Sequence, residues 1–354
     1  GDVYKRQIKG RAFMLILIIT IIAMMSQNLI PVHIAFIPIL IPPLLHLMNK
    51  LQIDRRAIAC ALAFGLKTPY IAIPAGFGLI FQGLIADNLT QNGMQIAVGD
   101  IWKSNWFLAL AMLTGLLIAL FITYRKPRKY KDIQISEDTA MQDEEQPLKF
   151  TKNHYLTLVA AFATLGVQLW TNSLPLGALV GLAVIFGTGA IDHKKMDKLM
   201  NEGIGLMGYV AFVMLVAAGF ALVLKQTGGI ESLVQAASVF MGGSRLLAAT
   251  IMLAIGLFIT MGIGTSFGTI PILAVLFVPV CAKIGLSIPA TVILLSAAAA
   301  LGDAGSPASD TTLGPTAGLN ADGQHNHITD TCIPTFLHYN IALIIFAVIA
   351  VYIF

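Results

Sequence analysis

Long hydrophobic runs separated by short polar stretches recur along the whole chain. They include residues 12–30, 106–124, 246–262 and 332–354. A helix needs about 20 residues, each rising 1.5 Å, to cross the hydrocarbon core of a bilayer, and the runs are close to that length. The strands of a membrane β-barrel would instead alternate hydrophobic and polar residues over about ten positions. The pattern therefore predicts an all-α polytopic membrane protein.

One polar, charged stretch at residues 125–153 divides the hydrophobic runs into two groups. It separates a first transmembrane half, 8–124, from a second half, 154–354. Five basic residues follow the preceding hydrophobic run directly, namely Arg125, Lys126, Arg128, Lys129 and Lys131. Because cytoplasmic loops carry an excess of Lys and Arg, this linker and the basic loop at 192–198 are predicted to be cytoplasmic. The hydrophobic runs predict about ten transmembrane segments, with 224–245 partial or re-entrant.

The composition is that of a membrane protein. The 354 residues are 57% hydrophobic and 11% charged, whereas soluble domains carry roughly 25% charged residues. The net charge of +4 lies mostly in loops, and no basic patch with interleaved aromatic residues indicates nucleic-acid binding. Cys60, Cys281 and Cys332 stand singly in hydrophobic segments, so we interpret them as packing residues. The sequence has no Walker loop, GxSxG elbow or HExxH motif, which gives ATP-driven transport and intramembrane proteolysis no support.

Two similar segments indicate an internal repeat. Residues 37–50 (IPILIPPLLHLMNK) and 270–283 (IPILAVLFVPVCAK) share IPIL, a later proline and a final lysine. Each is followed by a hydrophobic run that ends at a glycine and then a hydroxyl residue before a proline. About seven crossings separate the two lysines, and an odd number would invert the second copy. Inverted repeats broken by Gly and Pro are typical of secondary transporters that bind substrate near the midplane. Chance recurrence of short hydrophobic motifs is the alternative.

The segment 301–312 concentrates oxygen-bearing side chains directly after a hydrophobic run. Pro307 and Pro315 remove backbone donors, and the neighbouring glycines loosen the chain, so the helix is predicted to open here. Open backbone at membrane depth is stable only inside protein or beside water. The oxygen-bearing residues suit Na⁺ or a proton held by a carboxylate. They are Asp303, Ser306, Ser309, Asp310, Thr311 and Thr312, of which the two acids are predicted Na⁺ ligands. A capped cytoplasmic helix end is the alternative.

Further polar residues stand beside prolines in other predicted breaks. Lys67 and Thr68 lie between hydrophobic runs, directly before Pro69. Lys67 is predicted to neutralise an acid or bind a substrate carboxylate, or alternatively to extend its ammonium group to an interface. The other candidates lie at predicted tips of hairpins or broken helices, and they are Asn28, His33, Thr265, Ser266 and Thr269. His33 has two interpretations, a hydrogen-bonded core residue or a proton relay.

A polar loop with two histidines follows the segment at 301–312. His325 and His327 stand near Asp322 and Asp330. Their spacing does not match a tight metal-ligand pattern. We therefore interpret this loop as solvated or as part of a gate.

Four motifs resemble the NhaC-like Na⁺/H⁺ antiporter family of the ion transporter superfamily. They are NLIPVHIAFIPILIPPLL, DRRAIACALAFGLKTPYIAIPAGFG, GTSFGTIPI and LGDAGSPASDTTLGPTAGLNADGQHNHITDTCIPTFLHYN. The resemblance extends over the chain from about Gln7, and it is to a bacterial branch described both as sodium/proton antiporters and as amino-acid permeases, histidine among the suggested substrates. The N-terminal spans of that family are missing, and the chain begins at Gly1 without a start methionine. We therefore expect an N-terminally truncated fragment.

The resemblance implies a secondary active transporter of the bacterial inner membrane, with two inverted halves and alternating access to a midplane site. The first hypothesis is Na⁺/H⁺ antiport through Asp303 and Asp310. The second is Na⁺- or H⁺-coupled uptake of an amino acid such as histidine, with its carboxylate bound by Lys67 or a half-helix N-terminus. A membrane scaffold or sensor, the third, gains nothing from buried polar breaks. Expected partners are Na⁺, H⁺ and lipid, with a small amino acid and a homodimer left open, and we expect no cofactor, no nucleic acid and no enzymatic activity.

Overall fold

The computed structural model describes residues 2–28, 36–131, 152–171, 173–190 and 244–354, with residue 201 and a few positions between 215 and 236. Nearly all of the regular structure in this part is helical. The exception is a short parallel pairing of β1 (Leu301–Gly302) with β2 (Ala304–Gly305). The predicted all-α fold is therefore confirmed. Residues 132–151 of the linker predicted at 125–153, and the basic loop at 192–198, lie outside the described residues.

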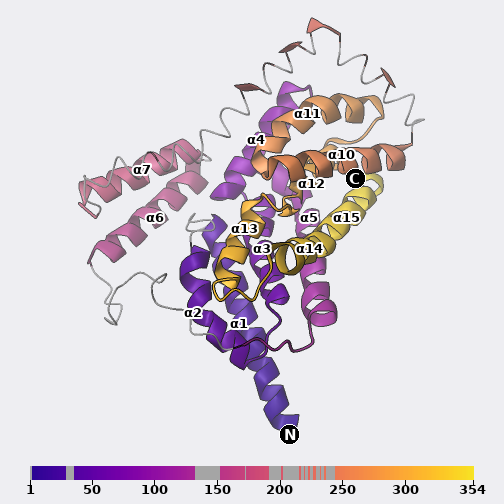
Figure 1. Ribbon diagram of the computed structural model, residues 1–354. Coiled ribbons are helices and arrows are strands. Elements are labelled where there is room, and N and C mark those ends of the chain that lie inside the picture. The colour runs from indigo at the N-terminus through magenta and orange to yellow at the C-terminus, as the bar shows by residue number, and fades with distance from the viewer. Residues whose placement is uncertain are drawn as a thin grey trace.

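The N-terminal part of the chain forms five helices and a π-helical turn (Figure 1). They are α1 (Asp2–Asn28), α2 (Ile37–Lys50), α3 (Arg55–Ala72), α4 (Phe77–Gln91), α5 (Val98–Ile118) and η2 (Ala119–Thr123). Asp54 caps α3 by accepting a hydrogen bond from the backbone N–H of Arg56. α3 and α4 meet at a bend of 49°. Gly76 lies in this bend with φ +55°, and a Cβ there would be 2.6 Å from the carbonyl oxygen of Gln27, so the bend requires glycine.

The C-terminal part of the chain contains a second helix that is broken near its centre (Figure 1). The helices of this C-terminal part are α6 (Lys152–Thr171), α7 (Leu174–Gly187), α10 (Arg245–Ile263), α11 (Ser266–Lys283), α12 (Ile288–Ala300), α13 (Asp310–Leu319), η4 (His327–Cys332), α14 (Ile333–Thr335), η5 (Phe336–Asn340) and α15 (Ile341–Ile353). The break separates α12 from α13. α6 and α7 pack against each other as a pair.

At the interface between the two parts of the chain, one helix from each part packs on a helix of the other part. α3 packs on α1 and α5, and α12 packs on α10 and α15. α4 packs on α11, whereas α13 packs on α2. Each helix that follows a break therefore contacts the other part of the chain.

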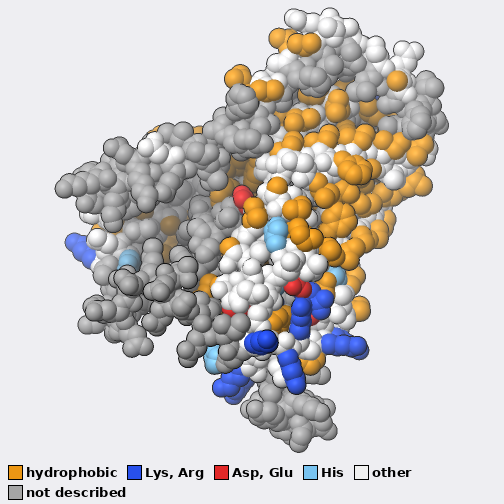
Figure 2. Space-filling view, viewed as in Figure 1, with side chains coloured by type: hydrophobic (Ala, Val, Ile, Leu, Met, Phe, Trp, Pro, Cys, Tyr) orange, Lys and Arg blue, Asp and Glu red, His pale blue; other side chains and the backbone are white. Residues whose placement is uncertain are grey.

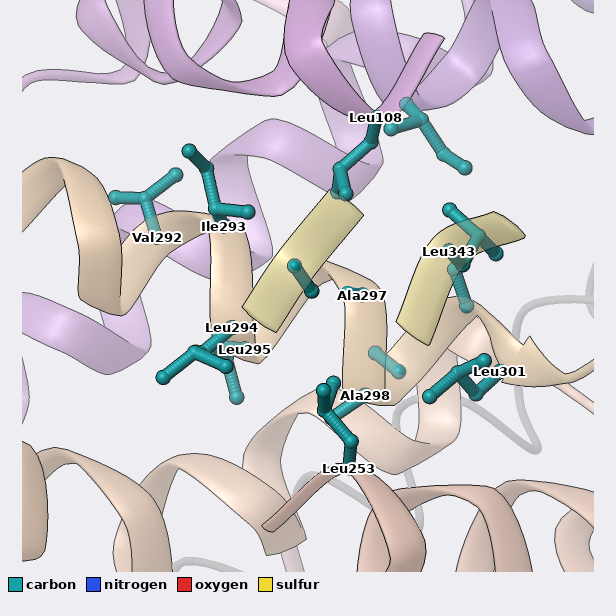
Figure 3. Packing of buried hydrophobic residues seen from close by; sticks show 14 of the residues in the cluster. Leu108, Leu253, Val292, Ile293, Leu294, Leu295, Ala297, Ala298, Leu301 and Leu343 are labelled. Atoms are coloured by element: carbon teal, nitrogen blue, oxygen red, sulfur yellow. The ribbon is translucent and has the colours of Figure 1, made fainter. Parts of the chain in front are cut away.

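Small residues let the central helices approach closely. A Cβ at Gly256 of α10 would lie 2.5 Å from the Cβ of Ala298 in α12, so only glycine fits this contact. Figure 3 shows the buried side chains around α12, including Leu108 of α5, Leu253 of α10 and Leu343 of α15. Close packing of this kind holds helices together in membranes, where burial from water contributes little. It places the C-terminal end of α12 deep inside the protein.

Five described helices are long and hydrophobic enough to cross a membrane, and the bent pair of α3 and α4 would make a sixth. The five spans are Gly10–Asn28, Val98–Thr123, Arg245–Ile263, Ser266–Lys283 and His327–Ile353. Figure 2 shows hydrophobic side chains over much of one face, with Lys and Arg gathered at the lower end of the view. The structure thus confirms several membrane-spanning helices, while ten crossings and an inverted repeat stay predictions.

Candidate functional site

The turn between α12 and α13 buries Asp303, which is 5% exposed. Gly302 and Gly305 flank it with φ +81° and +102°, values that side-chain-bearing residues rarely adopt. A Cβ at Gly302 would lie 2.6 Å from Cγ of Met261, and a Cβ at Gly305 would lie 2.5 Å from Cβ of Phe336. Both glycines are therefore required by conformation and by space, and together they fix the position of the acid.

Four hydroxyl groups from three helices donate hydrogen bonds to the carboxylate of Asp303. Oδ2 accepts from Oγ of Ser266 at 2.7 Å and from the phenol of Tyr70 at 3.0 Å. Oδ1 accepts from Oγ of Ser309 and from Oγ1 of Thr311, the latter at 3.3 Å. A buried charge is costly unless it is paired and hydrogen-bonded, and this shell supplies the hydrogen bonds.

Lys67 supplies the countercharge. Its Nζ lies 3.5 Å from Oδ2 of Asp303 and donates to the carbonyl oxygen of Ala300, the last residue of α12. The side chain is 0% exposed, so the ammonium group lies inside the protein and does not extend to an interface. Ser266 begins α11 and Ser309 is the N-cap of α13. The negative helix end therefore lies beside the ammonium group, and two positive helix ends lie beside the carboxylate.

Ser306 and Thr312 hold the shape of the turn. Oγ of Ser306 donates to the carbonyl oxygen of Met261 at 3.0 Å and accepts from the backbone N–H of Ala308. Oγ1 of Thr312 donates to the carbonyl oxygens of Ser306 and Ser309. These two predicted site residues bind backbone groups of the turn itself and of the last turn of α10, which keeps the donors around the carboxylate in place.

Of the candidates near the other break, Asn28 binds the end of α3. Its Nδ2 donates to the carbonyl oxygens of Pro69 and Ile73, each at 3.1 Å. Thr68 is buried, and its hydroxyl has no hydrogen-bond partner within the described ranges. His33 lies outside the described residues.

The remaining candidates lie at the N-terminal ends of α11 and α13. Thr265 is the N-cap residue of α11, and its carbonyl oxygen accepts from Oγ1 of Thr269 at 2.7 Å. Asp310 is exposed as the first residue of α13. The structure thus gathers one group of predicted residues around Asp303, which consists of Lys67, Ser266, Ser309 and Thr311.

Two residues of the site, Tyr70 and Asn340, are not predicted from the sequence. Tyr70 stands three residues after Lys67, and helical periodicity places both on one face if α3 continues through Pro69, as it does. Asn340 accepts from the backbone N–H of Gly302 at 3.3 Å and donates to the carbonyl oxygen of Ala304 at 2.9 Å. Its only sequence signal is a polar residue that interrupts the last hydrophobic run.

The chemistry of the site suits a hard cation. The carboxylate of Asp303 and the surrounding hydroxyl oxygens are ligands of the type that Na⁺ prefers. No group of three or more His, Cys, Asp or Glu side chains converges among the residues that the structure describes. An exchangeable Na⁺ or proton therefore fits the donors better than a tightly held transition metal.

A second charge cluster lies at the start of α3, outside the site. Both terminal nitrogens of Arg55 donate to the Asp322 carboxylate, at 2.6 and 2.5 Å, and one also donates to the carbonyl oxygen of Leu319. Burial acts to raise the pKa of Asp322, but the hydrogen bonds and charge of Arg55 outweigh it and hold this pKa below its usual range. Burial lowers the pKa of nearby His325 to about 4, so its imidazole is neutral near pH 7.

Comparison with known proteins gives one family and several relatives. The family model described as "Na+/H+ antiporter family" matches residues 61–351. "Putative amino acid transporter YuiF" of Bacillus subtilis (strain 168) is 48% identical over 343 residues, which cover 95% of this chain and 76% of the relative. "Uncharacterized membrane protein VP2115" of Vibrio parahaemolyticus is 50% identical over 344 residues, which cover 96% of this chain and 77% of that relative. An "Uncharacterized membrane protein" of Haemophilus influenzae is 46% identical over 339 residues, which cover 94% of this chain and 75% of that relative.

Proposed function

The chain belongs to the Na⁺/H⁺ antiporter family, and from this premise we propose that it exchanges Na⁺ for H⁺ by alternating access to the Asp303 site. Membership makes it a secondary transporter and not an enzyme. Its hydrophobic helices and its relatives make it a multi-pass protein of the bacterial inner membrane. The observation that carries the proposal is the buried pair of Lys67 and Asp303 at a broken helix.

Lys67 and Na⁺ compete for one carboxylate in this mechanism. The ammonium group 3.5 Å from Oδ2 balances the charge of Asp303 when Na⁺ is absent. When Na⁺ binds to the carboxylate, two positive charges share the site, and they repel by about 4 kcal/mol at 4 Å even with an effective dielectric constant of 20. Lys67 then releases its proton to the side from which Na⁺ came, and it regains one when Na⁺ leaves. One Na⁺ moves against one H⁺.

The hydroxyl shell allows this exchange without new side chains. Ser266, Ser309 and Thr311 donate to Asp303 in the structure, but each hydroxyl oxygen also has lone pairs for a cation. Rotation of the hydroxyl hydrogens converts the shell from donors into Na⁺ ligands. A role for exposed Asp310 as a second Na⁺ ligand stays a prediction, and its own substitution tests it.

We also infer that the two halves are inverted repeats. The order of elements is matched, since α1 to α4 correspond to α10 to α13. The packing is reciprocal, because α4 packs on α11 and α13 packs on α2. A side-chain amide from a later helix binds the backbone at each break, Asn105 of α5 at the carbonyl oxygen of Ile71 in the last turn of α3 and Asn340 of η5 at that of Ala304. These correspondences support the repeat that the IPIL segments predict.

The name of the Bacillus subtilis relative favours amino-acid transport as a second candidate function. A substrate carboxylate would then bind Lys67 or the N-terminal end of α11 or α13. In the structure Lys67 is already paired with Asp303, so an amino-acid carboxylate would have to displace the protein's own acid. This geometry favours cation exchange over amino-acid uptake.

Transport in everted membrane vesicles separates the candidates. We expect addition of Na⁺ to dissipate a preformed proton gradient in vesicles with the wild-type protein, and not in vesicles with Asp303→Asn. Labelled histidine and other amino acids are tested in the same vesicles. Amino-acid uptake without Na⁺-dependent proton flux would favour the second candidate. The absence of both activities would favour a scaffold or sensor.

A further inference from the structure

The side-chain amide of Asn340 binds the chain on both sides of Asp303. Its Oδ1 accepts from the backbone N–H of Gly302 at 3.3 Å, and its Nδ2 donates to the carbonyl oxygen of Ala304 at 2.9 Å. Asn340 is 1% exposed. A single amide therefore holds the residue before and the residue after the acid, in a turn whose own helical hydrogen bonds are broken.

The element that carries Asn340 touches the same turn at a second point. η5 has π-helical geometry, which occurs mostly as a short bulge within α-helices and frequently at functional sites. Phe336, at the other end of η5, packs so closely on Gly305 that no Cβ fits between them. Contacts at both ends of η5 leave the Asp303 turn little freedom to rotate.

Rotation of this turn would separate the carboxylate from its donors. Oδ1 faces Ser309 of α13 while Oδ2 faces Ser266 of α11, so each oxygen depends on the orientation of the backbone between α12 and α13. Partners that orient a ligand side chain set cation affinity although they do not touch the cation, and their loss typically costs 10–100-fold.

We propose that Asn340 is a positioning residue that sets the Na⁺ affinity of the Asp303 site by fixing the turn that carries the acid. The proposal rests on the proposed function of Asp303. Asn340 lies on η5, an element that supplies no donor to the carboxylate. The proposal makes this residue a further determinant of ion binding. Asn340 acts through two backbone groups and makes no direct bond to the ion.

Asn340→Leu tests the proposal, because leucine has nearly the same size and forms neither hydrogen bond. Asn340→Ser is the second variant, since its smaller hydroxyl side chain leaves less strain if leucine prevents folding. Tyr339→Phe is the matched control. It removes a buried hydrogen bond from the neighbouring residue, between the phenol of Tyr339 and the carbonyl oxygen of Cys60, and leaves the Asp303 turn unchanged.

The readouts are the Na⁺ concentration for half-maximal exchange, its pH profile, and the rise in melting temperature that Na⁺ causes in purified protein. We expect Asn340→Leu to raise the half-maximal Na⁺ concentration at least about tenfold, to move the pH profile and to weaken the thermal shift. Asn340→Ser should change the same three quantities in the same direction but by less, and Tyr339→Phe should match the wild type in all three. Unchanged Na⁺ dependence in both Asn340 variants would overturn the proposal, and so would an equal change in Tyr339→Phe.

Asp303→Asn distinguishes this failure from failure of the proposed function. If Asp303→Asn abolishes exchange and the Asn340 variants behave as the wild type, only the role of Asn340 is wrong. If Asp303→Asn retains Na⁺-dependent exchange and the Na⁺-dependent thermal shift, the proposed function itself is wrong.

Discussion

Lys67 and Asp303 depend on each other because both are buried. Lys67 is 0% exposed and Asp303 is 5% exposed. Removing one member of a buried ion pair typically costs 3–5 kcal/mol because an unpaired charge remains, whereas replacing both by apolar residues is often neutral. Stability and transport are therefore expected to respond differently to single and double substitutions.

Asp303→Asn is expected to abolish Na⁺-dependent proton flux and to lower the melting temperature, because it leaves the Lys67 ammonium without its countercharge. The double variant Asp303→Asn with Lys67→Met should recover most of the melting temperature but no flux. Thermal melting of purified protein and flux in vesicles measure the two effects. Asp310→Asn is the comparison at the exposed start of α13, and we expect a smaller loss of flux. Wild-type flux in Asp303→Asn would contradict the assignment.

The individual residues of the site were only partly predictable from the sequence. Acids and hydroxyls beside Gly and Pro indicated Asp303, Ser309 and Thr311, because those residue types are unusual after a hydrophobic run. The same reason indicates Lys67 but not its partner, because pairing between distant segments depends on how the fold brings α3 to the turn after α12. Tyr70 and Asn340 gave almost no signal, because a phenol or an amide in a hydrophobic helix is usually a packing residue.

At the scale of elements, the two helix breaks determine where the site forms. Pro69 does not end α3, which continues to Ala72, and the bend toward α4 follows at residues 73–76. α12 ends at Ala300, before the chain reaches Pro307, and Gly302 then takes a left-handed conformation. Composition therefore predicted that the helices break, and the conformation of single glycines determined the positions.

Gly305→Ala is expected to destabilise the turn by more than about 1 kcal/mol, since the left-handed conformation alone costs a side-chain-bearing residue 1–2 kcal/mol. Its φ of +102° and the contact with Phe336 both oppose a Cβ. We expect a lower melting temperature and weaker Na⁺-dependent flux. Gly99→Ala in α5 is the control, because a Cβ there meets nothing within 4 Å. Equal melting temperatures for the two variants would contradict the requirement for glycine in the turn.

At the scale of the whole molecule, the repeat predicts how the chain is inserted. Lys50 ends α2 and Lys283 ends α11, and both are exposed. Inverted copies place these two helix ends on opposite sides of the membrane. The hydrophobic pattern could suggest this relation but not establish it, because short hydrophobic motifs recur by chance and crossing counts depend on uncertain boundaries.

Labelling of single cysteines in intact cells tests the inversion. We expect a membrane-impermeant maleimide to label only one of Lys50→Cys and Lys283→Cys from outside, and the other only after permeabilisation. The native cysteines Cys60, Cys281 and Cys332 are buried, so the parent protein should give a low background. Labelling of both variants from the same side would end the inverted-repeat interpretation.

The Arg55–Asp322 pair joins the start of α3 to the loop after α13, and so connects the two halves at one end of the molecule. Arg55 is 0% exposed, and its guanidinium also stacks on Tyr130 at 4.3 Å. Because the pKa of Asp322 is lower in the folded protein than in the unfolded chain, the pair stabilises the fold above the unfolded value of about 4 and loses this effect as the pH falls through the lowered value.

Asp322→Asn should therefore lower the melting temperature most at pH 6–7 and progressively less as the pH falls below about 4, because the carboxylate of the unfolded wild-type chain becomes protonated there while that of the folded protein is protonated only at lower pH. Arg55→Leu combined with Asp322→Leu should recover stability at neutral pH, since no charge is left buried. Asp100→Asn is the control, because the Asp100–Lys103 pair is 48% and 63% exposed and such surface pairs contribute at most about 1 kcal/mol. Melting curves of purified protein from pH 3 to pH 7 measure these differences. If Asp322→Asn lowers the melting temperature no more than Asp100→Asn at pH 7, then the pair does not hold the two halves together, and the connection must come from the packing of α13 on α2 and α3.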